Sequence, residues 1–214
     1  MMLRILSNHP EIYGLNELHF FEQLWSSSDK NKALSPEQAA ELASKLLYVQ
    51  RDGYIGKTKS EKYLREARQV VDNMEGELLG HHVFTAMMNY ETTLQKRRIP
   101  CEKTPQNVFY LKEILELFPN ARVINMIRDP RAVMLSQKRK WRRRKMGATF
   151  ITPWEVFRLR VNYHPITLSK LWNAAISASL PFAEDERVLN VHFEDILEGP
   201  TSTAQTICAH LGVD

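Results

Sequence analysis

A short apolar run at residues 123–127 gives the clearest strand signal in the chain, with Asn125 as its one polar member. Runs of this kind are typical of strands buried in a parallel sheet. Arg128 closes the run, Asp129 follows in the position of a helix N-cap, and Pro130 takes the first helical position, where its missing N–H costs nothing. The pattern therefore predicts a buried strand that leads directly into a helix.

Amphipathic helical periodicity dominates the first half of the chain and predicts a helical lobe over about residues 30–98. Ser35 and Pro36 mark a helix start, as an N-cap followed by proline. Gly14 and Asn16 predict a turn before a short helix. Together these patterns predict further helices at residues 1–9, 35–49, 61–75, 82–98, 108–117, 153–179 and 201–211, and further strands at 99–101 and 187–193.

The composition is that of an ordinary globular protein. At 214 residues, with 43% hydrophobic and 25% charged residues, the chain suits one domain with a sizeable core. No apolar run approaches the roughly 18 residues of a membrane span, and no signal peptide is visible. Cys101 and Cys208 lie far apart and form no disulfide framework, so a reducing compartment is expected. These features predict a soluble, cytoplasmic protein.

Positive charge is concentrated in one stretch. The net charge is +4, but residues 128–145 hold nine Lys or Arg and one acid, which leaves the rest of the chain at −4. A local excess predicts a site for an anion and not a uniformly cationic surface. The run at 138–145, with Trp141 among its cations, has three interpretations. It is a solvated helix end, a contact for a sulfated or acidic acceptor or part of the lining of the donor site, or a nucleic-acid surface.

Arg128 and Ser136 are the candidate anion ligands. Ser136 lies eight residues after Arg128, about two turns into the predicted helix. A phosphate would suit a site of this kind, where a strand end and a helix N-terminus meet and a guanidinium and a hydroxyl lie close together. The alternative is an ordinary strand-to-helix turn.

At these residues, Ile-Arg-Asp-Pro-Arg-Ala-Val-x-x-Ser resembles the nucleotide-binding strand and helix of sulfotransferases that use 3′-phosphoadenosine 5′-phosphosulfate (PAPS). The resemblance implies that Arg128 and Ser136 hold the 3′-phosphate. The segment His-Phe-Glu-Asp-Ile at 192–196 is similar to a later segment of the family. The implied fold is α/β, a parallel sheet flanked by helices in a single domain over 1–214, with ligands at the carboxyl ends of the strands. Residues 99–145 and 186–214 would form its nucleotide-binding core.

Two further segments carry the implied catalytic residues. Glu-x-His-Phe-Phe at 17–21 resembles the stretch that supplies the general base in the carbohydrate branch of the family, which implies that Glu17 takes the acceptor proton and that His19 assists. The alternative is a surface Glu that caps a helix, with His19 packed on Phe21. Glu-Lys-Thr-Pro at 102–105 resembles the segment whose Lys contacts the bridging oxygen of the donor, so Lys103 would stabilise the leaving group. Its alternative is a solvated loop lysine.

Two other patterns resemble ligand-binding motifs but lack the required spacing. Residues 53–58 imitate a Walker A loop, but they have two residues between the glycines where that loop has four, so we expect a turn. The adjacent His81 and His82 have no carboxylate or cysteine at ligand spacing, and no metal is expected.

The resemblance also implies that a strand and a phosphate-binding loop precede the first helix, and that a basic loop follows Gly212. We therefore expect a P-loop-like sulfotransferase fold that lacks its N-terminal strand and phosphate loop, truncated at both ends, and expect residues 1–214 alone to transfer little or nothing.

The function implied is sulfuryl transfer from PAPS to a hydroxyl of a carbohydrate, lipid or small-molecule acceptor, with 3′-phosphoadenosine 5′-phosphate (PAP) as product and neither metal nor nucleic acid as partner. The alternatives are an inactive fragment and a polyanion- or nucleic-acid-binding module that uses residues 138–145.

Overall fold

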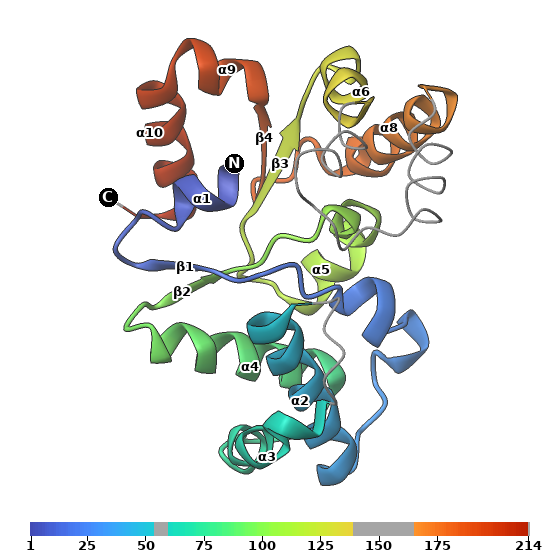
Figure 1. Ribbon diagram of the computed structural model, residues 1–214, viewed down its shortest axis with the longest axis vertical. Coiled ribbons are helices and arrows are strands. Elements are labelled where there is room, and N and C mark those ends of the chain that lie inside the picture. Colours follow the sequence, from blue (N-terminus) through green and yellow to red (C-terminus); the bar gives the residue numbers. More distant parts are fainter. Residues whose placement is uncertain (54–59, 139–164, 214) are drawn as a thin grey trace, which may run out of the picture. The chain divides into compact units, whose positions relative to one another are not determined.

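The computed structural model describes residues 1–53, 60–138 and 165–213 (Figure 1). The chain forms two compact units, Met1–Leu117 and Phe118–Asp214, and each is described by itself. In both units, helices flank a small parallel sheet, so the predicted α/β class is confirmed. The single domain over 1–214 stays a prediction. The turn predicted at residues 53–58, most of the basic run 138–145 and the first part of the predicted helix 153–179 lie outside the described residues.

The sheet of the first unit pairs β1 (Ile12–Gly14) in parallel with β2 (Ile99–Cys101), and Gly14 lies opposite Cys101. The predicted strand at 99–101 is confirmed, but the prediction of a turn at Gly14 is wrong, because Gly14 ends β1. A close approach explains the glycine: a Cβ at this position would clash with Ser7 Oγ, just after helix α1 (Met2–Leu6). Gly14 therefore lets α1 pack against the strand.

Three helices form the predicted lobe: α2 (Pro36–Asp52), α3 (Leu64–Asp72) and α4 (Gly80–Leu94). The predicted start of α2 is confirmed as a capping box, in which Ser35 Oγ accepts the Gln38 N–H at 3.2 Å and Gln38 Oε1 accepts the Ser35 N–H at 3.0 Å. Shorter turns of helix complete this unit: η1 (Phe20–Leu24), η2 (Ser27–Asp29), η3 (Ser60–Tyr63), η4 (Pro105–Tyr110) and α5 (Leu111–Leu117).

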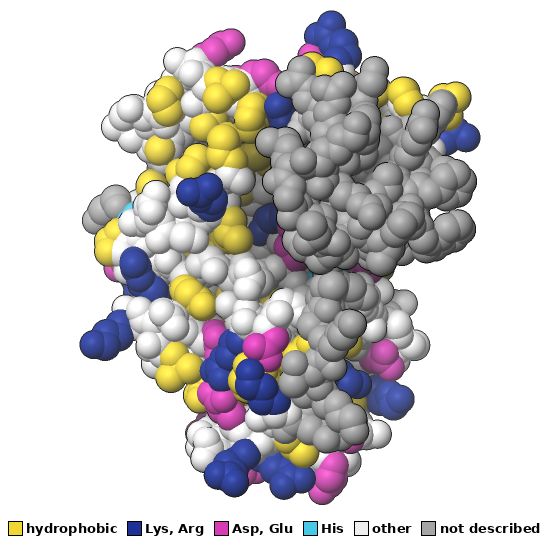
Figure 2. Space-filling model, viewed as in Figure 1, with side chains coloured by type: hydrophobic (Ala, Val, Ile, Leu, Met, Phe, Trp, Pro, Cys, Tyr) yellow, Lys and Arg dark blue, Asp and Glu magenta, His cyan; other side chains and the backbone are white. Residues whose placement is uncertain are grey.

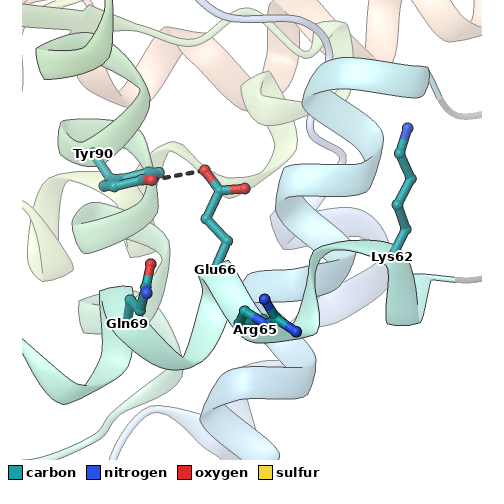
Figure 3. Close-up of a pocket in the computed structure, with 5 residues that line it drawn as sticks. All are labelled: Lys62, Arg65, Glu66, Gln69 and Tyr90. Atoms are coloured by element: carbon teal, nitrogen blue, oxygen red, sulfur yellow. Dashed lines mark hydrogen bonds between the residues drawn. The ribbon is translucent and has the colours of Figure 1, made fainter.

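A network centred on Arg51 joins the three helices of the lobe. Its guanidinium donates to both oxygens of Glu66 on α3 at 2.6 and 2.7 Å, and to Glu91 Oε1 on α4 at 2.6 and 3.1 Å. The Tyr90 hydroxyl also donates to Glu66, at 2.7 Å, beside an open surface pocket that Lys62 partly lines (Figure 3). Acidic and basic side chains intermingle over this region (Figure 2).

Replacing Arg51 with alanine should lower the free energy of unfolding by roughly 3 kcal/mol. The reason is that Glu91, with 3% of its surface exposed, would keep a buried charge without its guanidinium partner. Urea unfolding measures the change, with Arg65→Ala on the exposed side of α3 as the matched control. Equal losses in the two variants would contradict a specific role for the network.

The sheet of the second unit pairs β3 (Val123–Ile127) in parallel with β4 (Val188–His192), in register from Val123 opposite Val188. Both predicted strands are confirmed. The prediction that the first is buried is wrong: every residue of β3 is partly exposed, because the sheet has two strands within the described residues and its faces are incompletely covered.

Helices follow both strands at their carboxyl ends (Figure 1). α6 (Pro130–Lys138) follows β3 and packs against α8 (Pro165–Ser179), which continues into η6 (Leu180–Phe182). α9 (Phe193–Glu198) follows β4, and α10 (Pro200–Leu211) ends at Gly212 with φ 68°, as its predicted role of helix stop requires. Within the described ranges, no helix combines the length and the apolar character that a membrane span needs.

Candidate functional site

The segments that leave the carboxyl ends of β1 and β2 run side by side. The Leu15 N–H donates to the Cys101 carbonyl at 2.8 Å, and the His19 N–H donates to Thr104 Oγ1 at 3.2 Å. The parallel pairing of β1 and β2 therefore continues as contacts between residues 15–19 and 101–104. Ligands of parallel α/β sheets bind at this edge.

Glu17 and Lys103 form an ion pair at this edge, although 86 residues separate them in the sequence. The Lys103 ammonium donates to Glu17 Oε1. Both side chains are accessible, with 43% of Glu17 and 47% of Lys103 exposed. An exposed pair of this kind contributes only about 0 to 1 kcal/mol to stability. The ion pair can therefore break, and each group can bind a ligand instead, at little cost in free energy.

His19 lies beside this pair in a strained backbone conformation. Its φ of 52° is left-handed, which costs a residue other than glycine about 1 to 3 kcal/mol. The hydrogen bond to Thr104 holds the backbone, and the ring Nδ1 lies 2.8 Å from Glu22 Oε2. The other ring nitrogen, Nε2, lies 4.0 Å from Glu17 Oε2. The structure thus brings together the three side chains that the sequence singled out in this unit.

Glu102 supports this arrangement. The sequence pattern at 102–105 included this residue, but no role was predicted for it. Its carboxylate accepts hydrogen bonds from the Thr104 hydroxyl, from Asn107 Nδ2 at 2.6 Å and from the Leu18 N–H at 3.1 Å. Burial raises the pKa of this carboxyl, and the hydrogen bonds offset part of that effect. The sequence did contain a signal for this role. Neighbouring residues of an extended segment face opposite sides, so an exposed Lys103 places Glu102 on the inner side.

In the second unit, Arg128 follows β3 and stacks its guanidinium on the Phe193 ring of α9, with 4.2 Å between Cζ and the ring centroid. Its carbonyl accepts the indole N–H of Trp172 on α8 at 3.0 Å. Its Nε is buried and has no hydrogen-bond partner within the described residues. A buried donor left unpaired costs about 1 to 3 kcal/mol, so a partner outside the described residues would stabilise this group.

Asp129 has the N-cap role that the sequence predicted. Its Oδ1 accepts the Arg131 N–H at 2.7 Å, and the hydrogen bonds from the Arg131 side chain and backbone lower its pKa to about 2. Ser136 lies exposed on α6, and no hydrogen bond joins it to Arg128 in the part of the chain that the structure describes. Arg128 and Ser136 thus lie on successive segments, one just after β3 and the other on α6.

The described residues contain no group of three or more His, Cys, Asp or Glu side chains that could hold a metal ion. His81 and His82 stack edge to face, with ring centroids 4.4 Å apart.

Comparisons with known proteins identify the family. A family model described as the sulfotransferase family matches residues 1–214. A crystal structure of a sulfotransferase from Alicyclobacillus acidocaldarius is similar to this chain, with 22% sequence identity, a TM-score of 0.48, and coverage of 99% of this chain and 74% of that one. A search of curated proteins finds no match. Because the family model extends over residues 1–214, the chain belongs to the sulfotransferase family.

Proposed function

We propose that this protein transfers a sulfuryl group from PAPS to a hydroxyl group of a carbohydrate, lipid or small-molecule acceptor. Membership of the sulfotransferase family supports sulfuryl transfer in general. The main support for the catalytic roles proposed below is the Glu17–Lys103 ion pair, which lies beyond the carboxyl ends of β1 and β2. It combines a base for the acceptor and a cation for the leaving group in one exposed contact.

PAPS supplies the sulfuryl group when it is bound, and it departs as PAP. As the acceptor oxygen forms its bond to sulfur, Glu17 accepts the hydroxyl proton. As the bond from sulfur to the bridging oxygen breaks, the Lys103 ammonium stabilises the negative charge that this oxygen gains. His19, with its Nε2 at 4.0 Å from Glu17, helps to orient the carboxylate. By analogy with phosphoryl transfer, positioning and charge stabilisation provide the catalysis.

Arg128 and Ser136 are proposed to hold the 3′-phosphate. A guanidinium at this position fits this role, since it can form charge-assisted, bidentate hydrogen bonds to a phosphate. Stacking on Phe193 fixes the plane of the guanidinium, so its donors are oriented in advance. The exposed Ser136 hydroxyl is available to donate as well.

Replacing Arg128 with alanine should weaken PAP binding by roughly 10- to 100-fold, because charge-assisted hydrogen bonds contribute about 1.5 to 3 kcal/mol. It should also remove the preference for PAP over AMP, which lacks the 3′-phosphate. Isothermal titration calorimetry with both nucleotides measures the effect.

Arg122→Ala is the matched control for this experiment, because Arg122 precedes the same strand at its amino end and is exposed. Lys145→Ala tests the basic run. If the three substitutions weaken PAP and AMP binding equally and binding falls steeply with salt, a polyanion-binding surface replaces the phosphate site.

A further inference from the structure

Two side chains of the segment that follows β2 bind consecutive backbone N–H groups of the segment that follows β1. The Leu18 N–H donates to Glu102 Oε1 at 3.1 Å, and the His19 N–H donates to Thr104 Oγ1 at 3.2 Å. The Thr104 hydroxyl donates in turn to the same oxygen of Glu102. Glu102 and Thr104, together called the side-chain bridge, therefore hold the two peptide groups that follow Glu17.

The side-chain bridge is itself fixed by its surroundings. Thr104 is buried, with 4% of the residue exposed. Asn107 on η4 donates through Nδ2 to Glu102 Oε2 at 2.6 Å and through its backbone N–H to the Thr104 carbonyl at 3.0 Å. Both carboxylate oxygens of Glu102 thus accept hydrogen bonds. A buried polar network whose groups are satisfied is rigid, so the acceptors for the Leu18 and His19 N–H groups keep fixed positions.

The backbone held in this way carries two residues of the proposed mechanism. Leu18 is fully buried, whereas 43% of the Glu17 side chain is exposed. His19 keeps a left-handed φ of 52°. Such a conformation persists where the surrounding structure imposes it, and the hydrogen bond to Thr104 is one such constraint. Because the Glu17–Lys103 ion pair joins one residue of each segment, a shift between the segments would separate the carboxylate from the ammonium.

We propose that Glu102 and Thr104 are positioning residues, which hold the backbone beside Glu17 so that its carboxylate stays at the Lys103 ammonium. The inference rests on the proposed function and adds to it the residues that orient the general base. Neither side chain takes part in proton transfer or in charge stabilisation at the bridging oxygen. Loss of the side-chain bridge therefore acts on turnover through the position of Glu17, while the proposed 3′-phosphate site in the second unit is unaffected.

Amide hydrogen exchange, followed by NMR on residues 1–214 without any nucleotide, tests the side-chain bridge directly. Thr104→Val keeps the shape of the side chain but removes the hydroxyl that accepts the His19 N–H. Exchange at His19 should become roughly 2- to 10-fold faster, the effect of one hydrogen bond. The Leu15 N–H, which donates to the Cys101 carbonyl at 2.8 Å, serves as the internal reference. Thr104→Ser keeps the hydroxyl and should exchange like the unsubstituted chain.

Turnover tests whether the side-chain bridge acts through the base. In a form of the protein that also carries the expected phosphate-binding loop, Thr104→Val should lower kcat roughly 10- to 100-fold, because misplacing a reacting group by about 1 Å can cost 10²-fold. KM for PAPS should change less than kcat. In the Glu17→Gln background the same substitution should have little further effect, because residues that act as one unit are not additive. Glu102→Gln, which keeps one carboxylate oxygen, should retain more turnover than Glu102→Met.

Thr92→Val is the matched control, because it makes the same chemical change at a buried threonine of α4. Thr92 is 1% exposed, and its hydroxyl donates to the Met88 carbonyl at 2.6 Å. This variant should keep both the turnover and the ratio of His19 to Leu15 exchange. Two results would overturn the proposal: equal exchange at His19 in Thr104→Val and Thr104→Ser, or a loss of turnover in Thr104→Val that is undiminished in the Glu17→Gln background.

The two measurements separate this proposal from the proposed function. If exchange at His19 responds to the Thr104 hydroxyl as expected but nothing is transferred from PAPS, the side-chain bridge stands and the sulfuryl-transfer mechanism fails. If turnover depends on Glu17 while Thr104→Val exchanges and reacts like the unsubstituted protein, the positioning role alone is wrong.

Discussion

In a form of the protein that also carries the expected phosphate-binding loop, replacing Glu17 with glutamine should lower the turnover of sulfuryl transfer by about 10²- to 10⁴-fold, the contribution of a positioned general base. Glutamine keeps the size and the hydrogen-bonding oxygen of the side chain, but it cannot accept the proton of the acceptor hydroxyl. Affinity for PAP should stay unchanged, because the carboxylate is assigned to the acceptor. Initial rates with ³⁵S-labelled PAPS and calorimetric titration with PAP measure the two effects separately.

A second ion pair in the same unit provides a matched control. Lys30 and Glu116 lie 2.7 Å apart and are 43% and 44% exposed, close to the exposure of Glu17 and Lys103. Surface pairs contribute about 0 to 1 kcal/mol, so Glu17→Gln and Glu116→Gln should have similar, small effects on urea unfolding. They should differ in turnover. Full turnover in Glu17→Gln would remove this residue from the mechanism.

Replacing Lys103 with alanine should lower turnover by about 10²- to 10³-fold, as does the loss of a donor that stabilises a developing oxyanion. The ammonium acts on charge that appears at the bridging oxygen as the bond to sulfur breaks. Its contribution is therefore greater in the transition state than in the ground state. The maximal rate should fall more than the Michaelis constant for PAPS rises, as steady-state kinetics with varied PAPS would show.

Lys30→Ala removes an equally exposed ammonium from the control pair and should leave both kinetic parameters unchanged. Suppose instead that Lys103→Ala raised the Michaelis constant for PAPS at a constant maximal rate. Lys103 would then bind the donor equally in ground and transition states, and the leaving-group role would be wrong.

Elements with strong local signals could be predicted closely from the sequence. The strand at 123–127, the helix start after Asp129 and the N-cap at Ser35 all follow from residues within a few positions of each other. The start of α10 was also placed to within one residue. Caps, prolines and short apolar runs act over one or two helical turns, which is why such signals can be read without knowledge of the fold.

Short elements and burial were harder to predict. β1 has three residues and ends in Gly14, a residue that in isolation favours a turn. It becomes a strand because β2, which follows some 85 positions later in the chain, supplies its hydrogen-bond partners. The predicted burial of β3 was wrong for a similar reason, since coverage of a strand depends on how many other elements lie on the sheet.

The sequence by itself determined the family resemblance, the residue types of the candidate site and the local starts of the helices around it. Only the tertiary structure decided that the Glu17 carboxylate meets the Lys103 ammonium, and that Glu102 accepts the Leu18 N–H of the neighbouring segment. The physical reason is the register of two parallel strands. That register aligns segments distant in sequence, and both the contact between charges and the burial of polar groups depend on that alignment.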